Sequence, residues 1–104
     1  MQFMITAYDG KDSDAISRRM SVRPRHLENM CRVMENNKIL CAGGITNDAG
    51  ALVGSFLIME FPSRELFDKY LENEPYVTEN VWQDIKVETC NAVIINNEMG
   101  IIPL

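Results

Sequence analysis

The chain has 104 residues, which is the size of one domain with a single hydrophobic core. Its hydrophobic fraction of 46% and charged fraction of 24% exclude a largely disordered chain. Fifteen acidic residues against ten basic ones give a net charge of -5, which excludes broad binding to nucleic-acid backbones. No apolar run approaches the ~20 residues of a membrane span, and the first ten residues do not resemble a signal peptide. We therefore expect a cytoplasmic protein with no membrane partner.

The first part of the chain carries a strand pattern followed by a helix pattern. Residues 2–8 combine aromatic and β-branched residues in loose alternation, which predicts a strand. A short helical turn capped by Ser13 or Asp14 is expected to precede the main helix, which is predicted over residues 21–36. Pro24 is expected in the first turn of that helix, because proline there removes no helix hydrogen bond. Apolar residues at helical spacing predict its core stripe: Leu27, Met30, Cys31 and Met34.

Two strands follow the main helix. Residues 38–44 predict a strand that ends at two glycines, and residues 45–50 predict a plain hairpin loop without a phosphate-binding pattern. Residues 51–61 predict a third strand whose faces are both apolar: Val53, Leu57, Met59 and Phe61 on one, and Leu52, Phe56 and Ile58 on the other. A sheet with one wet face alternates polar and apolar residues instead. We therefore expect helices on one face and a second copy of the chain on the other.

The second half predicts one more helix and one more strand. Pro62 and Ser63 open a helix whose apolar face holds Leu66, Phe67, Tyr70 and Leu71. Pro75 ends it, because proline disfavours a helical backbone at the residue before it. Residues 81–95 predict the last strand, and residues 96–104 form a tail that is either disordered or packed on a partner.

The predicted order is strand, helix, strand, strand, helix, strand. This order is typical of an α+β, ferredoxin-like βαββαβ domain, with a four-stranded antiparallel sheet and both helices on one face. The domain is expected over residues 1–95.

Two further groups of residues bear on function. The three cysteines, Cys31, Cys41 and Cys90, are odd in number and accompany a single histidine, so we expect no metal site and buried, reduced thiols. The other group is the chain's one basic cluster, which is either a solvated helix start or a site for a small anion. Its members are Arg18, Arg19, Arg23 and Arg25.

Four motifs in the chain resemble those of the YCII-related (YciI-like) family. They are "RRMSVRPRHLENM", "ILCAGG", "GSFLIMEFPSRE" and "NEPYVTENVWQDIKVE", and they cover most of residues 3–90 in the family's order. The resemblance implies a dimeric α/β barrel of ferredoxin-like subunits and a site centred on a histidine–aspartate pair. The histidine falls on His26. The acid of the family's Asp-Pro turn falls on Glu74, which is one methylene longer, and Gly44 stands where the family has proline.

His26 and Glu74 are therefore the candidate catalytic residues. A carboxylate beside an imidazole fixes one tautomer of the ring, as a general acid or base requires; the alternative is a structural histidine with a surface partner. Three residues are candidates for binding a substrate. Arg23 would clamp a carboxylate or phenolate, Ser55 would bind a ligand or its own backbone, and Tyr76 would line the pocket or belong to the core.

Two functions fit these residues. The first is a lyase, isomerase or dehalogenase that needs no metal or cofactor and acts on a small, activated, cyclic and anionic substrate. The resemblance supports it, because some relatives act on chlorinated hydroxyquinone-type rings. The second is a non-catalytic dimeric module that binds a small metabolite. In both cases we expect a homodimer through the sheet faces, or a higher oligomer, and no nucleic-acid partner.

Overall fold

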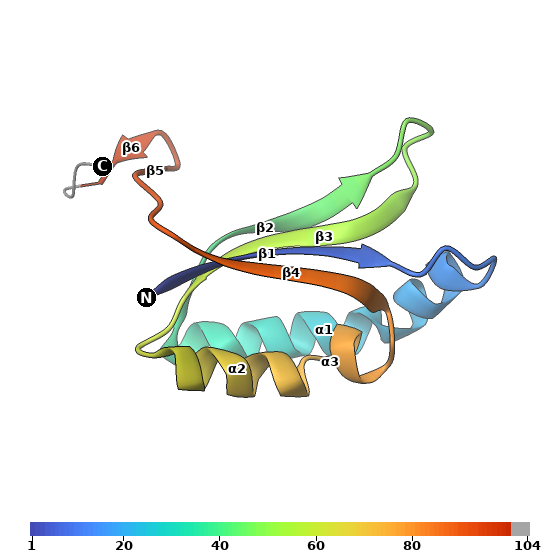
Figure 1. Ribbon diagram of the computed structural model, residues 1–104, viewed down its shortest axis with the longest axis horizontal. Coiled ribbons are helices and arrows are strands. Elements are labelled where there is room, and N and C mark those ends of the chain that lie inside the picture. The colour runs from blue at the N-terminus through green and yellow to red at the C-terminus, as the bar shows by residue number, and fades with distance from the viewer. Residues whose placement is uncertain (101–104) are drawn as a thin grey trace.

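The computed structural model describes residues 1–100 and is shown in Figure 1. Its elements are β1 (Gln2–Asp9), α1 (Ala15–Asn36), β2 (Lys38–Thr46), β3 (Leu52–Glu60), α2 (Arg64–Asn73), α3 (Pro75–Thr78), β4 (Trp82–Cys90), β5 (Ile94–Ile95) and β6 (Glu98–Met99). The four long strands form an antiparallel sheet of order β2-β3-β1-β4, and the helices lie together on one face (Figure 1). The predicted ferredoxin-like α+β architecture is confirmed.

The core lies between the helices and the two central strands. Along β1, Phe3, Ile5 and Ala7 alternate with more exposed residues and are each 0% exposed, which is the period-two pattern of a strand with one covered face. In α2, Phe67 stacks on Phe3 with ring centroids 4.2 Å apart, and thereby fixes the second helix to the sheet.

The opposite face of the sheet carries exposed apolar residues over β1 and β3 and charged residues over β4, and it is uncovered in the single chain. Tyr8 on β1 is 44% exposed and Phe56 on β3 is 38% exposed. Gly43 pairs with Phe56 in the register, and its missing side chain leaves room for the Phe56 ring. A Cβ at Gly43 would lie 2.7 Å from Cζ of that ring. Both faces of β3 therefore carry apolar residues, as predicted. The second copy expected over the uncovered face remains a prediction. Leu52 was assigned to the wrong face: it lies on the side of Ser55 and Leu57, because the pairing with β2 shifts register at the end of the hairpin.

The predicted helix boundaries were wrong at the start of α1. The helix runs without interruption from Ala15, so Pro24 lies in its interior rather than in its first turn. The upstream turns are held because Arg19 and Val22 are buried against the sheet. This packing outweighs the hydrogen bond that a proline removes from a helix interior. Pro24 itself is exposed.

The predicted core stripe was also partly wrong. Met30 is buried, but Leu27 is 43% exposed, Met34 is 54% exposed and Cys31 is exposed. The buried residues of α1 are instead Ala15, Arg19, Val22 and Met30. The expectation of buried thiols fails as well, since Cys41 is also exposed and Cys90 is half-buried.

Two strands end at other residues than predicted. β2 continues to Thr46, and the loop after it is closed by the Asn47 side chain, which accepts hydrogen bonds from two backbone N–H groups. The last predicted strand ends at Cys90. It is followed by a small hairpin whose turn residues, Asn96 and Asn97, have positive φ angles of 52° and 64°. Such angles favour a tight hairpin turn, so this part of the tail is ordered, while residues 101–104 lie outside the described part.

A buried ion pair connects α1 to the sheet. The guanidinium of Arg19 donates to both carboxylate oxygens of Asp9, at 3.0 and 3.1 Å, and to the hydroxyl of Ser55 at 2.9 Å. The indole N–H of Trp82 donates to the same hydroxyl at 3.1 Å. Buried polar groups thus join one helix to three strands.

A second buried carboxylate lies where α2 meets α3. Glu74 is 0% exposed and accepts a hydrogen bond from the Tyr70 hydroxyl at 2.8 Å. It also accepts one from the backbone N–H of Tyr76 at 3.2 Å and so caps α3, in which Pro75 occupies the first turn. Burial and then the charge of Glu74 raise the pKa of the Tyr70 hydroxyl far above its usual value.

Arg19→Met should destabilise the protein by about 3–5 kcal/mol, because it leaves the Asp9 carboxylate buried without its partner. The control is Arg18→Met, which removes the neighbouring but exposed pair with Asp12 and should change stability little. Urea unfolding of the two variants measures the difference. Equal losses would contradict a structural role for the buried pair.

Tyr70→Phe should change how stability depends on alkaline pH. Because the pKa of Tyr70 is raised in the folded state, the folded chain keeps a proton that the unfolded chain loses above pH ~10. The wild-type free energy of unfolding should therefore fall above that pH, with this tyrosine contributing about 1.4 kcal/mol per pH unit. Unfolding curves between pH 9 and 11 should show a shallower fall for Tyr70→Phe, whereas Tyr8→Phe at an exposed position should match wild type.

Candidate functional site

A pocket of about 440 Å³ opens between α1 and the hairpin of β2 and β3. Four of the five predicted site residues line it: Arg23, His26, Ser55 and Tyr76. The fifth, Glu74, does not line the pocket but contacts two of its lining residues, His26 and Tyr76. The structure therefore brings all five predicted residues to one place.

The imidazole of His26 is held between aromatic rings. It stacks on Tyr76 with ring centroids 4.0 Å apart and an angle of 7° between the planes. Trp82 meets it edge-on with centroids 6.0 Å apart. The His26 side chain is only 12% exposed, so its ring has one orientation toward the pocket.

Glu74 fixes the tautomer of this ring. Nδ1 of His26 lies 2.5 Å from Oε1 of Glu74. Because an ionised carboxylate can only accept hydrogen bonds, Nδ1 carries the proton in the neutral ring. Within residues 1–100, Nε2 makes no hydrogen bond, so it is the nitrogen left to exchange a proton with a ligand.

The Glu74 carboxylate is fully engaged from several elements. Besides His26, Tyr70 and the N–H of Tyr76, it accepts a hydrogen bond from the side-chain amide of Asn29 at 3.2 Å. The longer glutamate thus reaches the histidine and also caps the next helix. The departure from aspartate leaves the pair in contact.

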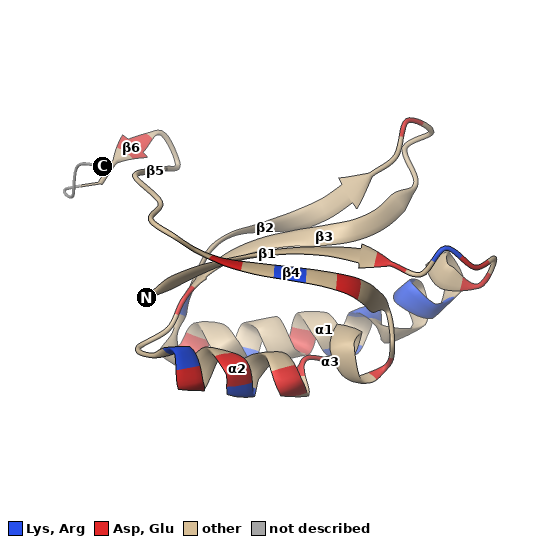
Figure 2. Cartoon of the chain, in the orientation of Figure 1, with Lys and Arg blue, Asp and Glu red and all other residues tan. Residues whose placement is uncertain are grey.

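The basic cluster separates into paired and unpaired members. Figure 2 shows Lys and Arg residues gathered near the start of α1. Arg18, Arg19 and Arg25 each bind a carboxylate: Asp12, Asp9 and Glu79. Arg23 is exposed at the pocket and forms no ion pair in the described part of the chain. It is therefore the arginine available to an anionic ligand.

The Ser55 hydroxyl also has a defined direction. It accepts hydrogen bonds from Arg19 and Trp82, and a hydroxyl offers two lone pairs and one proton. Its proton is therefore free to be donated toward the pocket that it lines. Tyr76 lines the same pocket, where burial raises the pKa of its hydroxyl although the nearby arginines lower it.

Four residues that support the site were not assigned this role from the sequence: Asp9, Arg19, Asn29 and Tyr70. Arg19 was named only as a member of the basic cluster. Arg19 and Asn29 lie seven residues before and three residues after His26, so they share its face of α1. Tyr70 precedes Glu74 by four residues, but it was assigned to the apolar face of its helix. Helical spacing could have grouped Arg19 and Asn29 with His26, and Tyr70 with Glu74. Nothing in the sequence indicated that Asp9 would contact Arg19.

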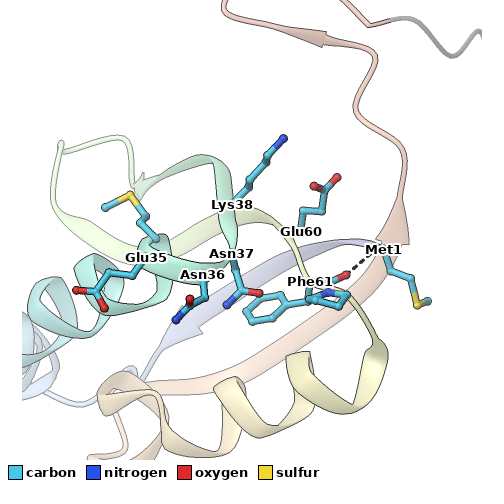
Figure 3. A pocket seen from close by; sticks show the side chains of 9 residues that line it. Met1, Glu35, Asn36, Asn37, Lys38, Glu60 and Phe61 are labelled. Carbon is cyan, nitrogen blue, oxygen red and sulfur yellow. Dashed lines mark hydrogen bonds between the residues drawn. The ribbon is translucent and has the colours of Figure 1, made fainter.

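A second hollow, shown in Figure 3, lies by the C-terminal end of α1. The backbone carbonyl of Phe61 accepts a hydrogen bond from the N-terminal amine at 2.8 Å there. None of the predicted site residues is among its described lining residues, which include Glu35, Lys38 and Glu60. The chemistry-bearing groups therefore gather in the pocket of His26.

Across residues 1–100, no three His, Cys, Asp or Glu side chains gather as they would around a metal ion. Over the same residues, no helix is both long enough and apolar enough to cross a membrane.

The chain is similar to curated proteins named Protein YciI. Those of Escherichia coli O6:H1 and Shigella flexneri are each 34% identical to it over 99 residues, which is 89% of this chain and 99% of each relative. Aspercryptin biosynthesis cluster protein B of Emericella nidulans is 28% identical over 76 residues, which is 66% of this chain and 49% of that protein.

A solved structure has the same fold. It is the 5-chloro-2-hydroxyhydroquinone dehydrochlorinase of Burkholderia phenoliruptrix in complex with 2,5-dihydroxybenzoquinone. The TM-score is 0.75 at 26% identity, and the match covers 88% of this chain and 94% of the other. The sequence model of the YCII-related domain matches residues 1–91. The chain therefore belongs to the YCII-related domain family.

Proposed function

We propose that this protein is a small-molecule enzyme in which His26 moves a proton on an activated, anionic ring compound. The observation that carries the proposal is the His26 ring, which lines a pocket with Nδ1 against the buried carboxylate of Glu74 and with Nε2 free of hydrogen bonds within residues 1–100. A histidine held in this way meets the geometric requirement for a general acid–base group. The reaction needs no group beyond the chain's own side chains.

The structural relative supports the class of substrate. That protein is named a dehydrochlorinase and was solved with 2,5-dihydroxybenzoquinone. The pocket of this chain offers matching groups for a ring with oxygen substituents: an unpaired cation at Arg23 and a hydroxyl proton at Ser55. Both stabilise a phenolate or quinone oxygen.

Loss of hydrogen halide can be written with these residues alone. A ring hydroxyl gives its proton to Nε2 of His26, and the imidazolium returns that proton to the ring carbon that bears the halogen. A second hydroxyl then loses its proton to solvent while the carbon–halogen bond breaks. The halide leaves with the bonding electrons and the ring becomes a quinone, so no oxidant or reductant is consumed. An isomerisation would use only the first two transfers.

The size of the catalytic effect fits an easy reaction. One positioned acid–base group supplies about 10²–10⁴-fold in rate. Glu74 does not line the pocket and acts through His26, so it is a positioning residue. Such a site suits substrates that already lose protons readily, as hydroxylated rings with a leaving group do.

His26→Asn should lower kcat by about 10²–10⁴-fold with little change in KM. The asparagine amide retains a donor toward Glu74 but lacks the atom that corresponds to Nε2. The assay follows quinone absorbance and halide release from 5-chloro-2-hydroxyhydroquinone. Activity equal to wild type would contradict the proposal, and binding without turnover by wild type would favour the alternative of a non-catalytic binding module.

The matching test of Glu74 uses two substitutions. Glu74→Gln should lower kcat and change KM much less. Glu74→Asp should be more active than Glu74→Gln, because aspartate keeps a negative charge beside Nδ1. Glu79→Gln is the control, since Glu79 forms an exposed pair with Arg25 away from the pocket. A stability loss with unchanged kcat in Glu74→Gln would leave the carboxylate only a structural role.

A further inference from the structure

The pocket continues past His26 as an apolar groove along α1. Leu27, Met30 and Met34 follow Arg23 by four, seven and eleven residues, so they form one stripe that lines the pocket. Met34 lies eight residues after His26, which is about 12 Å along the helix axis. Leu27 and Met34 are 43% and 54% exposed, although the sequence pattern assigned them to the core.

The opposite wall of the groove is apolar as well. It is formed by β2 and β3 and includes Ile39, Leu52 and Leu57. Leu52 reaches this wall because Gly44 has no side chain: a Cβ at Gly44 would lie 2.4 Å from Cδ2 of Leu52. The glycine where the family has proline therefore shapes this wall.

The polar groups of the pocket gather at its other end. Arg23, His26 and Ser55 surround the place assigned above to the reacting ring. A single six-membered ring spans roughly one turn of helix, about 5.4 Å, and cannot also fill the two turns that follow. A ligand that matches the whole pocket is therefore charged at one end and apolar along the rest.

We propose that the natural substrate is an anionic ring that carries a flexible alkyl substituent. The ring lies at His26, and the alkyl chain lies along Leu27, Met30 and Met34. Methionine side chains adapt to irregular apolar shapes, so the groove should accept chains of several lengths. The placement of the ring rests on the proposed function, whereas the alkyl groove rests on the stripe of α1 and the wall built around Gly44.

The test is titration calorimetry with 2,5-dihydroxybenzoquinone and its methyl, propyl and pentyl derivatives. Each added methylene should tighten binding about two- to fourfold, because it leaves water for an apolar surface. Affinity that stays flat or falls with chain length would overturn the inference, as would absence of binding by the longest derivative.

Matched variants locate the effect. Leu27→Ser and Met34→Ser should flatten the dependence on chain length, whereas Ile16→Ser and Met20→Ser should preserve it. Those controls lie on the same helix outside the groove, and each is 51% exposed. If the groove variants instead alter the mass of the protein in solution and leave the dependence unchanged, a second copy of the chain covers the groove and the inference fails.

Titration of His26→Asn with the same alkylated quinones separates the inference from the proposed function. The alkyl groove predicts that this variant keeps the dependence of affinity on chain length although it lacks the proposed acid–base group. If affinity rises with chain length but the wild-type protein turns over none of these compounds, the alkyl groove is retained and the proposed chemistry is rejected. Turnover of the unsubstituted ring with no preference for alkylated ones would retain the chemistry and reject the groove.

Discussion

The buried carboxylate of Glu74 is the constraint around which the helical layer is arranged. A charge that is 0% exposed is costly unless hydrogen-bond donors surround it. Its donors come from three helices: His26 and Asn29 of α1, Tyr70 of α2 and the N–H of Tyr76 in α3. Satisfying this one group therefore fixes the helices relative to each other and sets the orientation of the histidine.

A second buried charge connects that layer to the sheet. Arg19 binds Asp9 and Ser55, and its guanidinium lies 5.0 Å from the centre of the Tyr76 ring on which His26 stacks. The two polar clusters thus meet at Tyr76. The pocket opens beside this junction, so His26 is held on a rigid support, as the proposed proton transfer requires.

The order of elements and the pairing of His26 with Glu74 could be predicted, because strand alternation, prolines and family motifs each mark a local feature. The start of α1 could not be predicted in the same way. Its early turns are held by Arg19, whose burial depends on Asp9 in a different element. Read locally, an arginine beside other basic residues is more typical of a solvated surface.

The misassigned stripe of α1 has a related cause. Periodicity shows which residues share a face, but it does not show what that face meets. Leu27 and Met34 share a face that meets an open groove, while polar His26 and Asn29 point toward the buried carboxylate. Polar groups that face inward and apolar groups beside a pocket depart from the usual pattern of a helix, and such departures are expected at functional sites.

We infer that Glu74 holds the proton of His26 on Nδ1 and leaves Nε2 free for the proposed chemistry. Because His26 is the chain's single histidine, ¹⁵N NMR of histidine-labelled protein reports this ring alone. The hydrogen bond to Glu74 predicts that the neutral ring carries its proton on Nδ1 in wild type and loses that preference in Glu74→Gln. A neutral ring protonated on Nε2, or a mixture of tautomers that is the same in both proteins, would contradict it.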